Sequence, residues 1–265
     1  MRSFWCRLFI VLTASLVGGC CAGEIGGEWL WAPNYEKKPF DQQVVSEVAC
    51  GPTSALNTLR YSKISWSKLL REYEQSSDEE TLRNVIFNVA SLPSRDGSKI
   101  PLWSEKNLMT ADHYVEMLTV LQGKGFWKKR VKRYLLESEN AERSSLLEQV
   151  EERVRHSLEK EVAPTLELAL FVRPELSDLK IGHWVRLEGH LVVVLGLKKE
   201  AHSLTMLVAD SDGGRKYEIH LREEVSASDL AKPVLVVEAE GFRLWKKQKA
   251  QYPKHCLTIT GVIGR

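Results

Sequence analysis

The 265-residue chain lacks the features that mark several functional classes. Its 37 Lys and Arg residues nearly balance 35 Asp and Glu residues, and the formal net charge of +2 gives no indication of a nucleic-acid partner. No group of histidines and cysteines has metal-ligand spacing, and the chain has no glycine-rich phosphate loop or dinucleotide fingerprint. Aromatic residues make up only 8% of the chain, which gives no hint of a carbohydrate-binding surface. We therefore expect no cofactor, no metal and no nucleic acid.

The apolar run near the N-terminus is too short to span a membrane. This run, Leu8–Val17, follows two arginines and has the length of a signal-peptide core. One interpretation is that residues 1–22 form a signal peptide that is cleaved after Ala22, which leaves residues 23–265 as the mature domain.

A second interpretation of the same segment is a lipoprotein signal over residues 1–19. Val17-Gly18-Gly19-Cys20 approximates a bacterial lipobox, which would leave a lipid on Cys20 that tethers the protein to a membrane. Both interpretations predict export. We prefer a periplasmic or cell-envelope lipoprotein, with a secreted protein as the alternative.

The five cysteines divide into two groups. Cys6, Cys20 and Cys21 belong to the targeting segment, so only Cys50 and Cys256 remain in the mature domain. In an exported protein these two residues could form a disulfide, which would exclude a nucleophilic role for Cys50. The alternative is that Cys256 is a small buried residue on a strand near the C-terminus.

Cys50 has the sequence setting of a nucleophile. It lies in Ala49-Cys50-Gly51-Pro52-Thr53-Ser54-Ala55-Leu56-Asn57, where Pro52 suits the first turn of a helix. Unpaired backbone N–H groups and the helix dipole favour a thiolate at such a terminus. A cysteine that only packs in the core explains this segment equally well. The remaining residues of the candidate site decide between the two.

Candidate partners for Cys50 lie both before and after it in the sequence. Gln43 lies just upstream of Cys50, and His190 begins the apolar strand His190–Leu197. Asp210 ends the next apolar strand, Leu204–Asp210. If these two strands are antiparallel neighbours, His190 lies beside Asp210. A single cysteine with a distant histidine and aspartate is a candidate thiol-nucleophile site.

These residues resemble those of papain-fold cysteine peptidases, and in particular the bacteriocin-processing peptidase domain and its free-standing bacterial relatives. The resemblance covers Gln43, Cys50-Gly51-Pro52-Thr53-Ser54-Ala55, the strand that starts at His190, and Asp210. It implies an α+β, papain-like fold with an N-terminal helical half that carries the cysteine. A C-terminal antiparallel sheet would carry the histidine and aspartate. Residues 62–164 have no counterpart and are expected to form a helical insertion.

The resemblance also implies a role for each residue. Cys50 would attack a carbonyl carbon, and His190 would form an ion pair with Cys50 and protonate the leaving amine. Asp210 would orient His190, and the Gln43 side chain and the Cys50 backbone N–H would stabilise the oxyanion.

Three assignments have a neighbouring competitor. His183, in Gly182-His183-Trp184-Val185, could replace His190 as the base. Asp212 competes with Asp210, although the following Gly213-Gly214 favours a turn. Gln42 competes with the adjacent Gln43 as the oxyanion donor. We prefer His190, Asp210 and Gln43.

Apolar periodicity predicts helices before strands. The nucleophile helix is expected to end near Tyr61, and later helices to begin at a capping box at Ser77–Glu80, at Thr110 and near Leu146. The predicted strands are Leu166–Val172, His190–Leu197, Leu204–Asp210, Tyr217–Leu221, Leu235–Glu238 and Leu257–Val262.

The sequence therefore predicts an exported thiol hydrolase that cleaves peptide or amide bonds in a peptide or protein substrate. Two alternatives remain open. One is a transglutaminase-like acyltransferase with the same thiol chemistry, and the other is a non-catalytic papain-fold binding module of the envelope.

Overall fold

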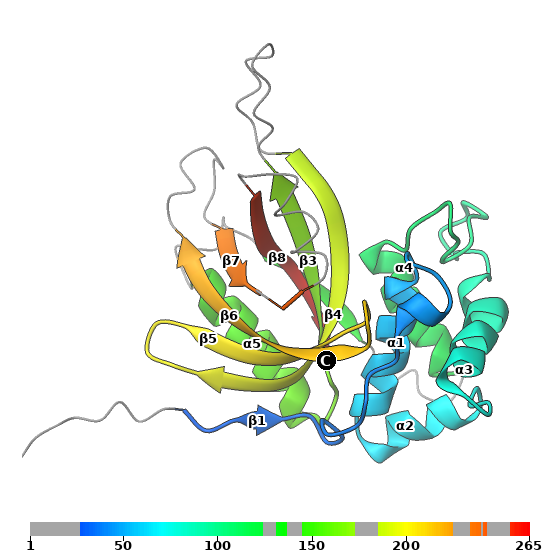
Figure 1. Ribbon diagram of the computed structural model, residues 1–265, viewed down its shortest axis with the longest axis horizontal. Coiled ribbons are helices and arrows are strands. Elements are labelled where there is room, and N and C mark those ends of the chain that lie inside the picture. Colours follow the sequence, from blue (N-terminus) through cyan, green and yellow to red (C-terminus); the bar gives the residue numbers. More distant parts are fainter. Residues whose placement is uncertain are drawn as a thin grey trace, which may run out of the picture.

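The computed structural model describes residues 27–123, 131–136, 145–172, 185–224, 234–239, 241–242 and 255–265. These residues form a β-barrel and a group of helices that packs against one side of it (Figure 1). The two predicted signal-peptide boundaries lie outside the described residues, as does His183.

Six strands form the barrel, in the order β4, β3, β8, β7, β6 and β5, and the pairing of β5 with β4 closes it. All of these pairings are antiparallel. The barrel strands are β3 (Thr165–Val172), β4 (Val185–Lys199), β5 (Leu204–Asp210), β6 (Arg215–Glu224), β7 (Val234–Glu238) and β8 (His255–Gly264). Two short strands extend the sheet: β1 (Leu30–Trp31) pairs with β4, and β2 (Lys132–Leu135) pairs with β8.

The prediction of an α+β papain-like fold is wrong, because the strands close into a barrel instead of forming an open sheet behind a helical half. Closure depends on β4. The first part of this 15-residue strand pairs with β3 and its last part pairs with β5. The register shifts between Val194 and Gly196, where β4 turns from one neighbour to the other. A bulge of this kind bends a strand and increases its twist, which allows a sheet to close.

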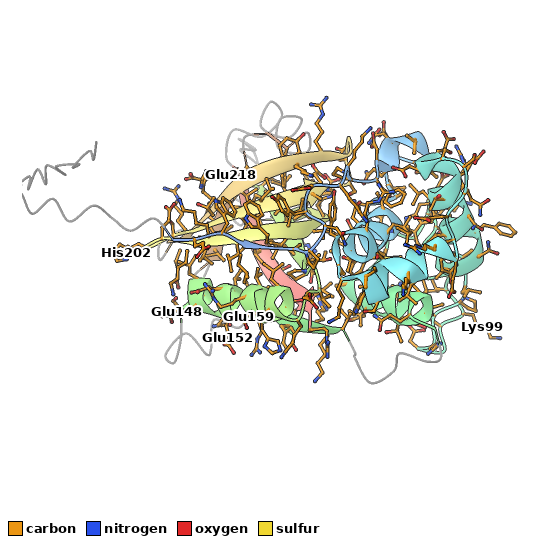
Figure 2. The ribbon with its side chains drawn as sticks, turned by 90° about the horizontal axis from the view of Figure 1, so that it is seen from below. Lys99, Glu148, Glu152, Glu159, His202 and Glu218 are labelled. Carbon is orange, nitrogen blue, oxygen red and sulfur yellow. The ribbon has the colours of Figure 1, made fainter. Side chains whose placement is uncertain are left out.

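Four helices lie together on one side of the barrel, where α1 contacts β4 (Figure 1). They are α1 (Cys50–Tyr61), α2 (Ile64–Arg71), α3 (Asp78–Val85) and α4 (Ala111–Leu121). A π-helical turn, Ile86–Ala90, continues α3. The fifth helix, α5 (Leu146–Glu159), packs its apolar face against the barrel. Figure 2 shows this helix along one face of the strands, with Glu148, Glu152 and Glu159 on it.

The buried apolar residues separate into two cores. One contains the inward-facing residues of the barrel strands and the apolar face of α5. The other holds α1 to α4 together and includes Leu191 of β4 and Ile263 of β8. Since these two strand residues belong to the helical core, the helices are attached directly to β8 and to β4, the strand that carries His190.

Most of the predicted elements are present. Helices α1 and α5 begin at Cys50 and Leu146 as expected, and α3 and α4 begin one residue after Ser77 and Thr110, whose side chains accept backbone N–H groups as caps. Strand β5 has the predicted bounds. Strand β4 begins five residues before the predicted start at His190, and α2, β1 and β2 are not predicted at all.

Among the residues that the structure describes, no helix combines the length and the apolarity that crossing a bilayer requires.

Candidate functional site

Cys50 is the first residue of α1 and is half-buried. The residue before it, Ala49, offers no side-chain cap, so the N–H groups of the first turn are not satisfied by a capping side chain. Pro52 lies in this first turn, where its missing N–H costs nothing. The terminus of α1 therefore presents both a thiol and unpaired backbone donors to a ligand.

Helix α1 is fixed to the barrel by buried hydroxyl groups. The Ser54 hydroxyl donates to the backbone oxygen of Leu191, the residue after His190, at 2.8 Å. One turn further on, the hydroxyls of Thr58, Tyr114 and Thr165 form a triangle with sides of 2.7 to 3.0 Å. This triangle joins α1, α4 and β3, so the position of Cys50 relative to β4 is set by rigid elements.

His190 and Asp210 are neighbours, as the predicted hairpin requires. Strands β4 and β5 pair antiparallel with Val192 opposite Asp210, and His190 Nε2 lies 2.7 Å from Asp210 Oδ1. Both side chains are buried. The remaining ring nitrogen, Nδ1, is therefore available to Cys50, which lies close enough to the ring to raise the pKa of His190.

The surroundings of His190 favour its charged form. Burial lowers the pKa of His190, but the Asp210 carboxylate and the contact with Cys50 outweigh burial and hold this pKa well above its ordinary value. His190 is thus held as an imidazolium beside the thiol. A neighbouring imidazolium is the usual means of stabilising a nucleophilic thiolate.

Asp210 is itself positioned by the turn that follows β5. Its Oδ1 also accepts from the backbone N–H of Asp212 at 2.9 Å. Its Oδ2 is buried and has no hydrogen-bond partner among the described residues. Asp210, and not Asp212, is therefore the carboxylate that contacts His190. Gly213 and Gly214, with φ of +91° and +56°, form the turn as expected.

Of the two adjacent glutamines, Gln42 lines the cavity beside Cys50 and Gln43 does not. The Gln43 side chain donates to Asp212 Oδ1 at 2.7 Å and is held away from Cys50. The buried Gln42 side chain accepts from the Ser211 hydroxyl at 2.8 Å and donates to the Glu47 carbonyl. Gln42, the alternative that the sequence left open, is therefore the glutamine that the structure places beside Cys50, whereas the role of either glutamine as an oxyanion donor stays a prediction.

Gln42 faces the cavity and Gln43 does not because a short 3-10 turn, Gln42–Val44, begins at this point. Asp41 caps this turn by accepting from the backbone N–H of Gln43 at 2.9 Å and also accepts from the Gly213 N–H at 3.0 Å. Successive side chains of a 3-10 helix point about 120° apart. The cap therefore decides which of the two glutamines faces the cavity.

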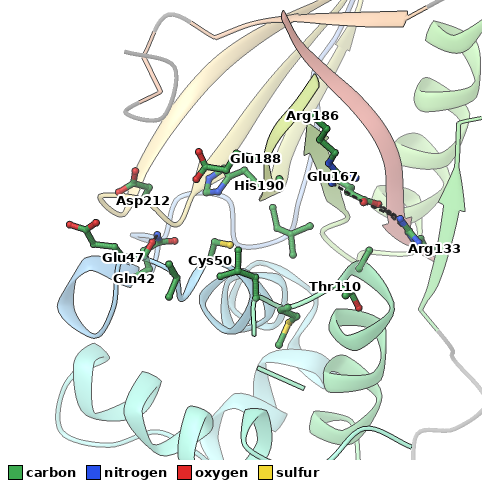
Figure 3. A pocket seen from close by; sticks show the side chains of 16 residues that line it. Gln42, Glu47, Cys50, Thr110, Arg133, Glu167, Arg186, Glu188, His190 and Asp212 are labelled. Carbon is green, nitrogen blue, oxygen red and sulfur yellow. Dashed lines mark hydrogen bonds and ion pairs between the residues drawn. The ribbon is translucent and has the colours of Figure 1, made fainter. Parts of the chain in front are cut away.

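Cys50, His190 and Gln42 line one cavity of about 410 Å³ (Figure 3). Its walls are the start of α1, residues 108–111 before and at the start of α4, and residues of β2, β3 and β4. Met109 packs against Gly51, where an added Cβ would lie 2.6 Å from the Met109 sulfur. A volume of this size matches small-ligand and substrate pockets.

The far end of the cavity contains charged residues that sequence reasoning missed: Arg133, Glu167 and Arg186. Glu167 is buried, and Arg133 binds it through Nε and Nη2 at 2.8 to 3.0 Å. Alternation along β4 would place Arg186 on the same strand face as His190. In the pairing of β3 with β4, Leu170 is opposite Glu188 and Phe171 is opposite Arg186, so Leu187 is an extra residue on β4. This extra residue turns the Arg186 side chain away from the face of His190, and it lies near Glu167.

Neither Cys50 nor Cys256 forms a disulfide, so Cys50 is a free thiol in this structure. Cys256 is buried on β8, opposite Phe171 of β3. Within the described residues, no group of three or more histidine, cysteine or acidic side chains is arranged to hold a metal ion.

Comparison of the chain with protein-family models and with curated proteins finds no match.

Proposed function

We propose that this protein is a thiol hydrolase that cleaves peptide or amide bonds through Cys50. The observation that carries the proposal is that Cys50 lies beside His190, whose ring is hydrogen-bonded to Asp210, and that the thiol and the ring line one substrate-sized cavity. The thiol comes from a helix terminus, the imidazole from a barrel strand and the carboxylate from the adjacent strand. Nucleophile, base and orienting group are thus arranged as in other triads of this kind, which recur on unrelated folds.

The reaction begins when the Cys50 thiolate attacks the carbonyl carbon of the scissile amide and forms a C–S bond. The carbonyl oxygen becomes an oxyanion. As the tetrahedral intermediate collapses, the C–N bond breaks and the His190 imidazolium gives its Nδ1 proton to the leaving nitrogen. The product is an amine and a thioester on Cys50. His190, now neutral, takes a proton from water, whose oxygen attacks the thioester and releases the carboxylic acid and the thiolate.

Two donors support the oxyanion. The first is the backbone N–H of Cys50, which lies at the first position of α1 and has no capping side chain. The second is the Gln42 amide, whose Nε2 donates one proton to the Glu47 carbonyl and has no second protein acceptor among the described residues. Loss of one such donor lowers the rate by about 100- to 1,000-fold in enzymes that use this device.

The proposal is tested by the pH dependence of Cys50 alkylation with iodoacetamide. The modified cysteine is identified by peptide mass mapping, and the buried Cys256 serves as an internal control for unfolding. We expect Cys50 to react well below pH 7, and we expect His190→Ala to abolish that reactivity while His183→Ala retains it.

Two results would change this conclusion. A Cys50 that reacts only near the ordinary thiol range, about 8.5, would reject the thiol hydrolase. Loss of the low-pH reactivity in His183→Ala, but not in His190→Ala, would make His183 the base.

The oxyanion donor is tested by comparing substrate turnover in Gln42→Ala and Gln43→Ala. Only Gln42→Ala should lower kcat.

A further inference from the structure

The cavity beside Cys50 carries opposite charges at its two ends. Figure 3 shows Glu47 and Asp212 at one end, Arg133 and Arg186 at the other, and Cys50 between them. Glu188 lies beside His190. A bound substrate therefore meets a different electrostatic environment on each side of its scissile bond.

The two arginines differ in how many of their N–H groups already donate hydrogen bonds to acidic residues. Arg133 donates to Glu167 at 2.8 to 3.0 Å and to Asp112 at 3.4 Å. The Arg186 guanidinium lies 3.8 Å from Glu167, which is an ion pair beyond hydrogen-bond distance. One buried carboxylate is therefore shared by two guanidinium groups. Asp112, 79% exposed, is screened by solvent, so this end retains a local positive charge.

The backbone leaves room for Arg186 in the cavity. An added Cβ on Gly189 would lie 2.9 Å from Arg186 Nη2, so the guanidinium crosses β4 over a position that has no side chain. Gly189 directly precedes His190, which places this guanidinium in the wall of the cavity that contains Cys50. The start of α4, at Thr110 and Ala111, lines the same end and adds the positive end of a helix dipole.

From these contacts we infer that Arg186 binds a carboxylate of the substrate, so that the substrate is a peptide or amide with an acidic group close to the scissile bond. A guanidinium presents a planar fork of donors that matches a carboxylate in a bidentate geometry. Glu167 pairs with this arginine at 3.8 Å, and the half-exposed guanidinium keeps its outer donors for the ligand. This inference rests on the proposed function, because it names the substrate class of the same site.

The test uses four iodoacetyl probes that alkylate Cys50 with loss of iodide, so that no substrate has to be known. Iodoacetyl-glycine and iodoacetyl-glycinamide differ only in an α-carboxylate. Iodoacetyl-glutamic acid α-amide and iodoacetyl-glutamine α-amide differ only in a side-chain carboxylate. In the wild-type protein we expect the charged member of one pair to react about 10- to 100-fold faster than its neutral partner. The pair that shows this preference identifies the source of the carboxylate.

Matched variants assign the preference to Arg186. Arg186→Gln and Gly189→Ala, which displaces the guanidinium and leaves the net charge unchanged, should both bring the ratio of the charged to the neutral rate within that pair to about 1, whatever the absolute rates. Arg222→Gln is the control: this residue pairs with Glu238 on the barrel, outside the cavity lining, and its loss changes the net charge equally. It should retain the preference.

The outcomes separate this inference from the proposed function. Equal rates within both wild-type pairs, or a preference that survives Arg186→Gln, overturn the carboxylate site even where Cys50 shows its low-pH reactivity. Conversely, a preference that depends on Arg186 supports the site even where His190→Ala leaves the alkylation rate unchanged, a result that would overturn the proposed function alone.

Discussion

Replacing Asp210 by asparagine removes one charge from the candidate site and leaves its shape intact. An asparagine in the same position keeps the oxygen that accepts from His190 Nε2 at 2.7 Å and from the Asp212 N–H at 2.9 Å. Its amide nitrogen takes the place of Oδ2, which is buried without a partner. The carboxylate is the main group that raises the pKa of His190 against the effect of burial. We therefore expect a neutral His190 in Asp210→Asn.

The size of the effect follows from the ionisation of an ordinary thiol. At pH 6, a thiol with a pKa of about 8.5 is about 0.3% ionised, so it offers about 300-fold less thiolate than one held ionised by an imidazolium. Part of this factor is offset, because a thiolate that forms at lower pH is also a weaker nucleophile. The expected fall in the rate of Cys50 alkylation by iodoacetamide at pH 6 is therefore about 10- to 300-fold.

Asp210→Ala provides the structural control. In this variant the His190 ring Nε2 and the Asp212 backbone N–H lose the oxygen that accepts their hydrogen bonds. Each buried group left without a partner costs about 1–3 kcal/mol. We expect Asp210→Ala to lower the free energy of unfolding by about 2–6 kcal/mol in urea titrations. Asp210→Asn should stay within about 2 kcal/mol of wild type, because His190 can lose its proton and avoid an unpaired buried charge. The same alkylation profile in Asp210→Asn and wild type would refute the role of Asp210.

The raised pKa of His190 also predicts how stability depends on pH. The folded protein retains a proton on His190 that the unfolded chain loses above about pH 6.5. The stabilisation is complete below this value and is lost as the pH rises through the folded-state pKa. The free energy of unfolding of the wild type should therefore decrease with pH over this interval, relative to Asp210→Asn. An unfolding free energy that rises over the interval would contradict the assignment.

Two further substitutions test the support of the site. Gly51→Ala brings a Cβ within 2.6 Å of the Met109 sulfur and should destabilise the protein by about 1–2 kcal/mol in urea titrations, after allowance for the better helix propensity of alanine. Met109→Gly, which removes the sulfur and also the Cβ that would lie 2.8 Å from the added atom, should relieve this cost in the double variant, and an unrelieved cost would disprove the clash. Tyr114→Phe removes two hydrogen bonds but leaves Thr58 and Thr165 paired at 3.0 Å, so the expected loss is about 1–2 kcal/mol with an unchanged dependence on urea concentration. Burial raises the pKa of Tyr114 to about 12, so this loss should be the same at pH 6 and pH 9, and a pH-dependent loss would contradict a neutral hydroxyl network.

Features that depend on neighbouring residues could be predicted from the sequence. The helix that begins at Cys50, the caps at Ser77 and Thr110 and the bounds of Leu204–Asp210 follow from apolar periodicity and from capping groups within a few residues. The meeting of His190 with Asp210 follows as well, because two consecutive antiparallel strands bring the start of one beside the end of the other.

Features set by contacts between distant segments could not be predicted. Barrel closure depends on a bend in β4 that directs its two halves to β3 and β5, and strand periodicity is the same in an open sheet and in a barrel. The choice of Gln42 over Gln43 depends on Asp41, whose carboxylate also accepts from Gly213 across the fold. A shift of that turn by one residue would direct Gln43 instead of Gln42 toward the cavity.

The sequence by itself determined the chemical groups of the candidate site and the local elements that carry them, because helix caps and strand alternation act over a few residues. Only the tertiary structure decided which groups share a cavity. Arg186 shows the reason: a single extra residue opposite β3 moves its side chain away from the face that alternation assigns, and next to Glu167. Such register shifts are set by how strands pair and close, which no short stretch of sequence specifies.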